Sequence, residues 1–259
     1  MISDIGWNKM FDSFRKFRSL NQLRKSSLVL VYTMGKVGST SIEKKISNSY
    51  HTHTLYGKPP SVPYHIQRFG KFGFYLRRYT VYPLKRLLIR SHKKVKIVTF
   101  YRDPKRRNPS MFMHDLPFWL SSYIVRNGIQ TRKEDSKFLV SAYKQDFPHK
   151  YPLFWVREEL SRFTGISASN LVLGNKNYRV EENGQYSVFI GRTEQLQKFL
   201  PELADFLEVD DLDGVGSVNR GGKKWYAPVY DEFVKALSLD GDIEYAEEFR
   251  KINGYADES

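Results

Sequence analysis

Two short segments carry the residue types that bind anions in proteins. The first, at residues 33–41, reads Thr-Met-Gly-Lys-Val-Gly-Ser-Thr-Ser. Its glycines let the backbone approach an anion, its hydroxyl groups donate hydrogen bonds, and a helix is expected to begin directly after it. We therefore expect a phosphate-binding loop whose contacts come from Lys36, Val37, Gly38, Ser39, Thr40 and Ser41.

The lysine of this loop is not where a P-loop kinase or NTPase would place it. In the Walker A motif lysine directly follows the second glycine, whereas here Ser39 follows Gly38 and the lysine, Lys36, precedes both. The apolar run at residues 95–101 also lacks the terminal acidic residue that would hold magnesium. A kinase or NTPase is therefore kept only as an alternative function.

The second segment, at residues 101–112, reads Tyr-Arg-Asp-Pro-Lys-Arg-Arg-Asn-Pro-Ser-Met-Phe. Arg102 can form paired hydrogen bonds with a phosphate, Arg107 adds a second positive charge, and Ser110 can donate near the start of a helix. These residues predict a second anion site. The alternative is an ordinary strand-to-helix turn whose arginines lie in solvent.

Both segments follow apolar runs that are typical of buried strands, at residues 28–32 and 95–101. Ligands of parallel sheets bind beyond the carboxyl ends of the strands, so both loops should lie at that edge. The other expected elements are strands at residues 50–55, 170–173 and 187–190, and helices at 40–48, 64–91 (in pieces broken near Gly70, Gly73 and Pro83), 110–128, 133–146, 155–163, 193–207, 225–237 and 243–252.

Strands that alternate with helices predict a three-layer α/β fold around a central, mostly parallel sheet. No change in composition marks a boundary, so we expect residues 1–259 to form a single domain. Residues 1–25 place aromatic and basic side chains at helical spacing. They predict an N-terminal amphipathic helix that either docks on the domain or makes peripheral contact with an anionic membrane.

Composition narrows the function classes. The net charge of +14 favours anionic ligands, so a non-catalytic binder of a polyanion is a second alternative. The chain has no cysteine, which excludes disulfides, thiolate metal sites and a cysteine nucleophile. No apolar run approaches the roughly 20 residues of a spanning helix, and no signal-peptide core is present. We therefore expect a cytoplasmic protein.

Together the two loops resemble the PAPS-dependent sulfotransferase superfamily, where PAPS is 3′-phosphoadenosine 5′-phosphosulfate. Its members carry Lys-x-Gly-Ser/Thr-x-Ser/Thr, which binds the 5′-phosphosulfate, followed by Arg-Asp-Pro-x-x-Arg-x-x-Ser-x-Phe, which binds the 3′-phosphate. Residues 36–41 and 102–112 match these patterns in that order. The resemblance implies a P-loop-like sulfotransferase fold and sulfuryl transfer to a hydroxyl, with Lys36 stabilising the leaving phosphate, 3′,5′-bisphosphoadenosine as product and no metal.

A third segment, at residues 219–230, is similar to the Asn-x-Lys-Trp-Tyr signature of bacterial sulfotransferase-like proteins linked to capsular polysaccharide synthesis. The resemblance implies that Arg220, Lys223 and Lys224 cover the 3′-phosphate and that the acceptor is a carbohydrate; nucleic acid is not an expected partner. The alternative is a basic turn before an amphipathic helix. An enzyme that binds the nucleotide but has lost turnover is also compatible with these residues.

The acceptor hydroxyl needs a general base, and histidine suits this role because its pKa lies near neutrality. His51 and His53 lie on an expected strand, where alternation puts both rings on one face. Uronyl 2-O-sulfotransferases carry a similar His-x-His, which implies that His53 is the base and His51 its neighbour or substitute. The alternatives are structural histidines at both positions, or another base, for which the candidates are Glu43, His114 and Asp115.

The remaining histidines, His65, His92 and His149, are expected at the surface, and no spacing completes a metal site. Aromatic and arginine side chains mingle at residues 64–79. They suit an anionic glycan, because sugars stack on aromatic rings and arginines pair with its charges. Packing of these aromatic residues in a core or a lid is the alternative.

Overall fold

The structure is a computed structural model that describes residues 28–46, 49–57, 70–120, 136–212, 214–215, 226–238 and 247–255. Several sequence predictions fall outside these ranges. They are the helix at residues 1–25, the three basic residues of the late loop and one histidine: Arg220, Lys223, Lys224 and His65. None of the helices in the described ranges is long and apolar enough to cross a membrane.

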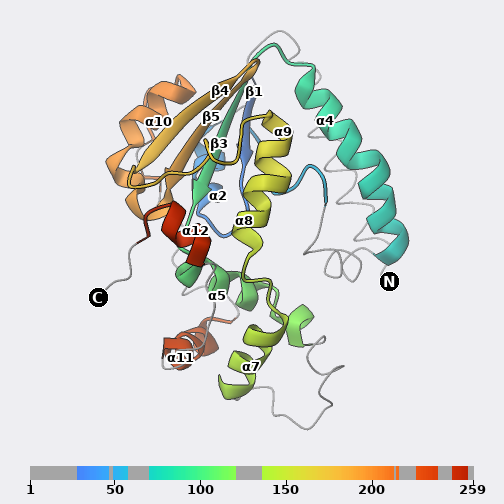
Figure 1. The fold of residues 1–259 in the computed structure, drawn as a ribbon, viewed down its shortest axis with the longest axis vertical. Helices are drawn as coiled ribbons and strands as arrows, with labels where there is room; N and C mark the ends of the chain where they lie inside the picture. The colour runs from blue at the N-terminus through green and yellow to red at the C-terminus, as the bar shows by residue number, and fades with distance from the viewer. Residues whose placement is uncertain are drawn as a thin grey trace.

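A five-stranded sheet forms the centre of the protein (Figure 1). The strands lie in the order β2 (Ser49–Thr52), β1 (Leu28–Tyr32), β3 (Val95–Tyr101), β5 (Tyr186–Arg192) and β4 (Tyr178–Asn183). The first four are parallel, and β4 pairs with β5 in the antiparallel sense at the edge. The predicted α/β class with a mostly parallel sheet is therefore confirmed.

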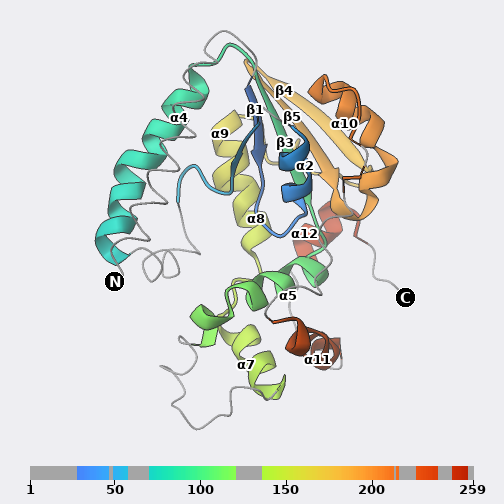
Figure 2. The ribbon, with the colours of Figure 1, turned by 180° about the vertical axis from the view of Figure 1, so that it is seen from behind.

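Helices cover both faces of the sheet, which explains why its strands are apolar on both sides. A continuous helical stretch, α8 (Tyr151–Trp155), η2 (Val156–Ser161) and α9 (Arg162–Thr164), covers one face. Seen from behind, α2 (Ser39–Lys45) covers the other (Figure 2). Four of the five β1 side chains are completely buried between these layers.

The chain reverses its direction of winding between β1 and β3. It leaves β1 through α2 to reach β2 on one side, and then returns to form β3 on the other side of β1. The loops that follow β1 and β3 therefore diverge from adjacent strand ends, which is where open parallel sheets bind their ligands.

Residues 70–90 form one continuous helix, which we call the helical arm; the expected breaks at Gly73 and Pro83 are wrong, whereas the described helix begins at Gly70, whose φ angle is 70°. It contains a π-helical segment, η1 (Arg77–Val81), followed by α4 (Tyr82–Arg90). Proline normally clashes with the carbonyl four residues earlier. The wider π turn directly before Pro83 displaces that carbonyl, so the helix continues.

The helix after β3 begins earlier than predicted. α5 (Pro104–His114) starts six residues before the expected residue 110 and ends long before residue 128, with a separate helical stretch at 116–120. Asp103 caps its first turn by accepting a 2.9 Å hydrogen bond from the Lys105 N–H, and Pro104 takes the first helical position. Arg107 and Ser110 consequently lie inside the helix.

The strand predicted at residues 170–173 is also wrong. Leu171 and Leu173 are buried there, but the backbone forms a turn and an irregular segment. The edge strand is β4, whose side chains are mostly polar, and a two-residue turn at Gly184 and Gln185 joins it to β5. The Asn183-Gly184 pair is a hairpin signal that could have located this strand.

The remaining helices complete the fold. The predicted helix at 193–207 is divided into a 3-10 helix, η3 (Thr193–Lys198), and α10 (Leu200–Leu207). The chain closes with α12 (Glu247–Ile252).

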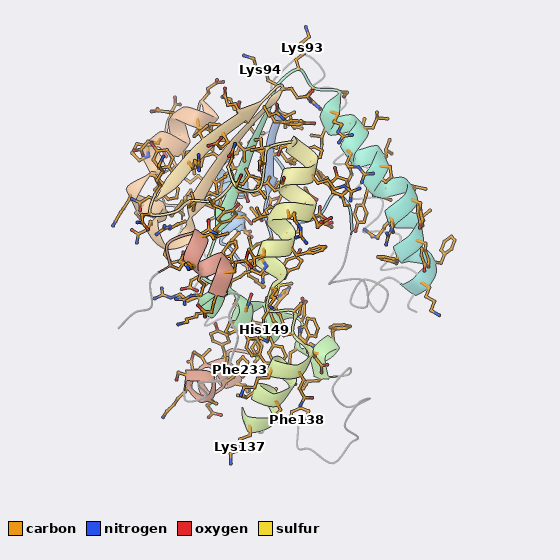
Figure 3. All side chains as sticks on the ribbon, in the orientation of Figure 1. Lys93, Lys94, Lys137, Phe138, His149 and Phe233 are labelled. Carbon is orange, nitrogen blue, oxygen red and sulfur yellow. The ribbon has the colours of Figure 1, made fainter. Side chains whose placement is uncertain are left out.

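A second apolar cluster lies beyond the carboxyl edge of the sheet, where α5, α7 (Ser136–Asp146) and α11 (Ala227–Ser238) meet. Figure 3 shows Phe138 and Phe233 in this cluster and Lys137 pointing away from it. Phe112 of α5 lies at its centre, with its ring 5.3 Å from that of Phe233 and 5.2 Å from that of Tyr143. α5 thus joins the end of β3 to this helical cluster.

Candidate active site

The loop after β1 has an unusual backbone. Gly35, Lys36 and Gly38 have φ angles of 81°, 60° and 78°, so three of four consecutive residues are left-handed. This conformation costs little for glycine but is unfavourable for lysine. A strained residue of this kind persists only where its surroundings hold it, as they do at many functional sites.

Two arginines from the second predicted segment hold this loop in place. Arg102 Nη1 donates to the Lys36 carbonyl at 3.1 Å. Arg107 Nε donates to the Gly35 carbonyl at 3.3 Å, and its Nη2 donates to the Met34 carbonyl at 3.1 Å. The loops after β1 and β3, which the sequence predicted at one edge of the sheet, are therefore in direct contact.

Arg107 lies behind the loop rather than at its surface. Its side chain is buried, with Nη1 donating to Asn108 Oδ1 at 2.7 Å and the guanidinium 5.0 Å from the centre of the Tyr151 ring. Desolvation lowers the pKa of Arg107 to about 10, which still leaves it charged at neutral pH. Arg102, by contrast, is half-buried, so solvent reaches part of it.

Ser110 lies one helical turn beyond Arg107, inside α5, and is buried. The hydroxyl residues of the first loop differ in exposure: Ser39 and Ser41 are buried, whereas Thr40 is exposed. The Ser41 hydroxyl donates to the Gly38 carbonyl at 2.8 Å and stabilises the start of α2.

The end of β5 forms a third part of the site that sequence reasoning missed. Thr193 Oγ1 donates to the Val37 carbonyl at 2.9 Å, so it holds the loop after β1 from the other side. Glu194 Oε1 accepts a hydrogen bond from the Asp103 N–H at 3.0 Å, and desolvation raises the pKa of Glu194. Their position directly after a predicted strand was the available signal.

His51 and His53 lie side by side, as alternation predicted. Their ring centres are 4.6 Å apart in an edge-to-face arrangement. β2 ends at Thr52, so His53 is the first residue beyond the strand. A Cβ atom placed on Gly35 would lie 3.9 Å from His53 Nδ1, which puts this histidine against the loop next to Lys36.

Both ring nitrogens of His51 have partners within the site. Nδ1 lies 2.7 Å from Glu43 Oε2, and Nε2 lies 3.2 Å from Ser39 Oγ. Because a carboxylate only accepts, Nδ1 carries a proton and donates it to Glu43, while Nε2 pairs with the Ser39 hydroxyl. Ser39 in turn accepts from Thr33 Oγ1 at 3.2 Å. His51 therefore connects α2 to the loop.

In His53, the hydrogen bond that holds the ring is made by Nδ1. Its Nδ1 lies 2.9 Å from the Thr33 carbonyl, which can only accept, so Nδ1 carries the proton and Nε2 has the lone pair. The pKa of His53 is lowered to about 4, first by desolvation and then by the charge of His51. The side chain is nevertheless open to solvent on one side, and this solvent screens the shift. His53 is neutral at pH 7.

A buried glutamate fixes the segment that follows His53. Glu159 accepts hydrogen bonds from Thr54 Oγ1 and the Leu55 N–H, both at 2.7 Å, and from the Tyr32 hydroxyl. Burial raises the pKa of Glu159. Trp155 Nε1 also donates to the His53 carbonyl at 2.9 Å. The backbone on both sides of His53 is therefore held by the helical layer.

The other candidate bases are Glu43, His114 and Asp115. Glu43 is bound to His51, His114 is exposed at the last residue of α5, and Asp115 is buried beside it. The predicted surface position of His92 is wrong, because it is buried with Nδ1 3.0 Å from the Leu88 carbonyl. His149 is half-buried, with Nε2 3.0 Å from the Tyr143 carbonyl.

Comparisons with protein-family models, with curated proteins and with solved structures gave no match. In the part of the chain that the structure describes, no group of three or more histidine, aspartate or glutamate side chains could hold a metal ion.

Proposed function

We propose that this protein is a sulfotransferase with a P-loop-like sulfotransferase fold, which moves the sulfuryl group of PAPS to a hydroxyl of a carbohydrate. The contact between Arg102 and the Lys36 carbonyl, 3.1 Å long, is the observation that supports this most. It brings the two predicted anion-binding loops to adjacent strand ends, close enough for one bisphosphorylated nucleotide to contact both.

The donor set fits such a nucleotide. The Lys36 ammonium, the backbone N–H groups of residues 38–41 and the Thr40 hydroxyl are suited to the 5′-phosphosulfate, since all of them donate to anionic oxygens. Arg102 and Ser110 are suited to the 3′-phosphate, and Arg220, Lys223 and Lys224 are proposed to cover it. Arg107 acts behind the loop by holding two of its carbonyls.

Transfer by in-line displacement makes two demands on these residues. Lys36 stabilises the negative charge that builds up on the 5′-phosphate oxygen as the bond from sulfur to that oxygen breaks. On the opposite side of the sulfur, the acceptor oxygen forms its new bond and releases its proton. A positioned general base contributes about 10² to 10⁴-fold to a step of this kind.

His53 is the base that we propose, and its hydrogen bonds distinguish it from His51. Thr33 holds its Nδ1 proton, which leaves the Nε2 lone pair of a neutral ring to take the acceptor proton. His51 has both nitrogens engaged by Glu43 and Ser39, so we assign it a positioning role.

The experiment is a binding and turnover measurement on the full chain. Binding of 3′,5′-bisphosphoadenosine is measured by calorimetry without magnesium, and sulfuryl transfer from radiolabelled PAPS is measured on a panel of neutral and anionic polysaccharides. The proposal predicts magnesium-independent nucleotide binding and labelled glycan. Magnesium-dependent ATP binding would favour the kinase alternative, and salt-sensitive binding of every polyanion without transfer would favour a non-catalytic binder.

A further inference from the structure

The helical arm, residues 70–90, has apolar residues on two faces. Phe74, Tyr82 and Ile89 are buried and attach it to the rest of the protein. A second set is exposed: Phe72, Tyr75, Tyr79, Leu84 and Leu87. Phe72 exposes 79% of its surface and Leu87 exposes 65%. A surface helix normally presents polar residues to water, so this outer face requires a partner.

The exposed set forms a large apolar surface. Tyr75 and Tyr79 stack one turn apart, with ring centres 6.2 Å apart and planes inclined by 9°. Phe72 lies one turn before Tyr75, and Leu87 lies two turns after Tyr79. With about 150–250 Å² for each aromatic side chain, the set presents on the order of 500 Å², near the upper limit for a monomeric protein.

The net positive charge of the chain arises from a segment that contains the helical arm. Residues 44–102 contain 14 of the 42 lysine and arginine residues and none of the 28 aspartate and glutamate residues. The remaining 28 basic and 28 acidic residues cancel, so this one segment accounts for the entire net charge of +14. The described part of the segment includes the helical arm and the turn that follows it.

Basic side chains lie beside the apolar face and in the turn after the arm. The guanidinium of Arg78 lies 5.9 Å from the centre of the Tyr79 ring. At the other end of the arm, Lys93 and Lys94 are exposed, and Figure 3 shows both pointing away from the body of the protein. Figures 1 and 2 show the arm along one side of the sheet, with the end near Gly70 leaning away from it.

We propose that the helical arm binds the surface of a membrane that contains anionic lipids. Leucine and phenylalanine side chains have no hydrogen-bonding groups, and they gain most from entering the acyl boundary, while the nearby lysines and arginines reach the anionic headgroups. A carbohydrate would use the tyrosines but not Leu84 and Leu87. A second copy of the chain would bring two basic faces together, which their charge opposes.

Vesicle sedimentation with the full chain tests this proposal. We expect binding to phosphatidylcholine vesicles that contain phosphatidylglycerol, little binding to phosphatidylcholine alone, and weaker binding at high salt. The double variant Phe72→Ser, Leu87→Ser should bind anionic vesicles at least tenfold more weakly, from lost apolar burial. Lys93→Gln and Lys94→Gln should each weaken binding by about fivefold.

Matched controls come from α11, where Val234 is also an exposed apolar residue and Lys235 an exposed basic one. Val234→Ser and Lys235→Gln should leave vesicle binding unchanged, and thermal unfolding should show that every variant is folded. The proposal is wrong if the arm variants bind like the controls, because the vesicle contact then lies elsewhere. It is equally wrong if the arm variants lose self-association or polysaccharide binding while the wild-type chain does not bind vesicles.

Discussion

If His53 is the base of the proposed transfer, His53→Ala should lower kcat without preventing nucleotide binding. The ring is held by a 2.9 Å hydrogen bond from Nδ1 to the Thr33 carbonyl, and its Nε2 carries the lone pair. A general base typically contributes 10² to 10⁴-fold, so we expect kcat to fall by about that factor, which corresponds to about 3–5 kcal/mol of activation free energy. Binding of bisphosphoadenosine should change little.

The pH dependence of the proposed transfer by the wild-type protein gives a sharper form of this prediction. Because desolvation and the charge of His51 lower the pKa of His53, its ring should stay neutral to a lower pH than a histidine with the ordinary pKa of about 6.5. Activity should therefore persist at pH 5.5 and fall as the pH approaches 4. His51→Ala should move this fall to higher pH, because the charge of His51 contributes to the lowered pKa.

Unfolding must be separated from this loss of activity. The unfolded chain binds the His53 proton at its ordinary pKa, above that of the folded state, so the unfolded state carries more protons between about pH 6.5 and pH 4. The contribution of His53 to folding stability therefore decreases as the pH falls through this window. Circular dichroism at each pH, with activity measured on the fraction that remains folded, corrects for it.

The assay measures sulfuryl transfer to the best acceptor from pH 4 to pH 8. It compares the wild type with His53→Ala, His51→Ala and His114→Ala. His114→Ala is the matched control, because His114 is an exposed candidate base at the end of α5. Full activity in His53→Ala would refute the assignment, and so would an acid limb near pH 6.5 in the wild type. A loss in His114→Ala alone would move the base to α5.

Three further substitutions test the loops. Lys36→Ala should lower kcat by about 10² to 10³-fold in the transfer assay while bisphosphoadenosine still binds, and unchanged kcat would remove Lys36 from the mechanism. Arg102→Ala should weaken bisphosphoadenosine binding by about 1–3 kcal/mol in calorimetry, whereas the exposed neighbour Lys105→Ala should not; equal effects would indicate general electrostatics. Arg107→Met leaves two loop carbonyls without their donor. Urea denaturation should therefore show a free energy of unfolding that is lower by about 2–5 kcal/mol. An unchanged free energy of unfolding would contradict the structural role of Arg107.

The strands and loops that form the site were largely predictable from the sequence. β1 and β3 have the bounds that were predicted, since a strand buried on both faces is apolar at most of its positions. The edge strand β4 was not predicted, because its mostly polar side chains do not form such a run. Its hairpin turn was the only local signal.

Helix boundaries were harder to predict where two local rules conflict. At residues 70–90, Gly73 and Pro83 predicted breaks. A π turn accommodates the proline, and burial of one face of the arm stabilises a continuous helix. At α5 the Asp103-Pro104 pair is a standard helix start, but the same two residues also belong to the anion-binding motif, which indicated a loop there.

The residue types of the site, and their order along the chain, follow from the sequence alone. Glycine, proline and apolar runs act through the backbone within a few residues, so the position of each loop after its strand is a local property. Which side chain faces a ligand is decided only by tertiary structure. Arg107 binds carbonyls of residues more than seventy positions away, and His51 and His53 differ through partners on α2 and the loop after β1. Such hydrogen bonds exist only once the sheet has brought those segments together.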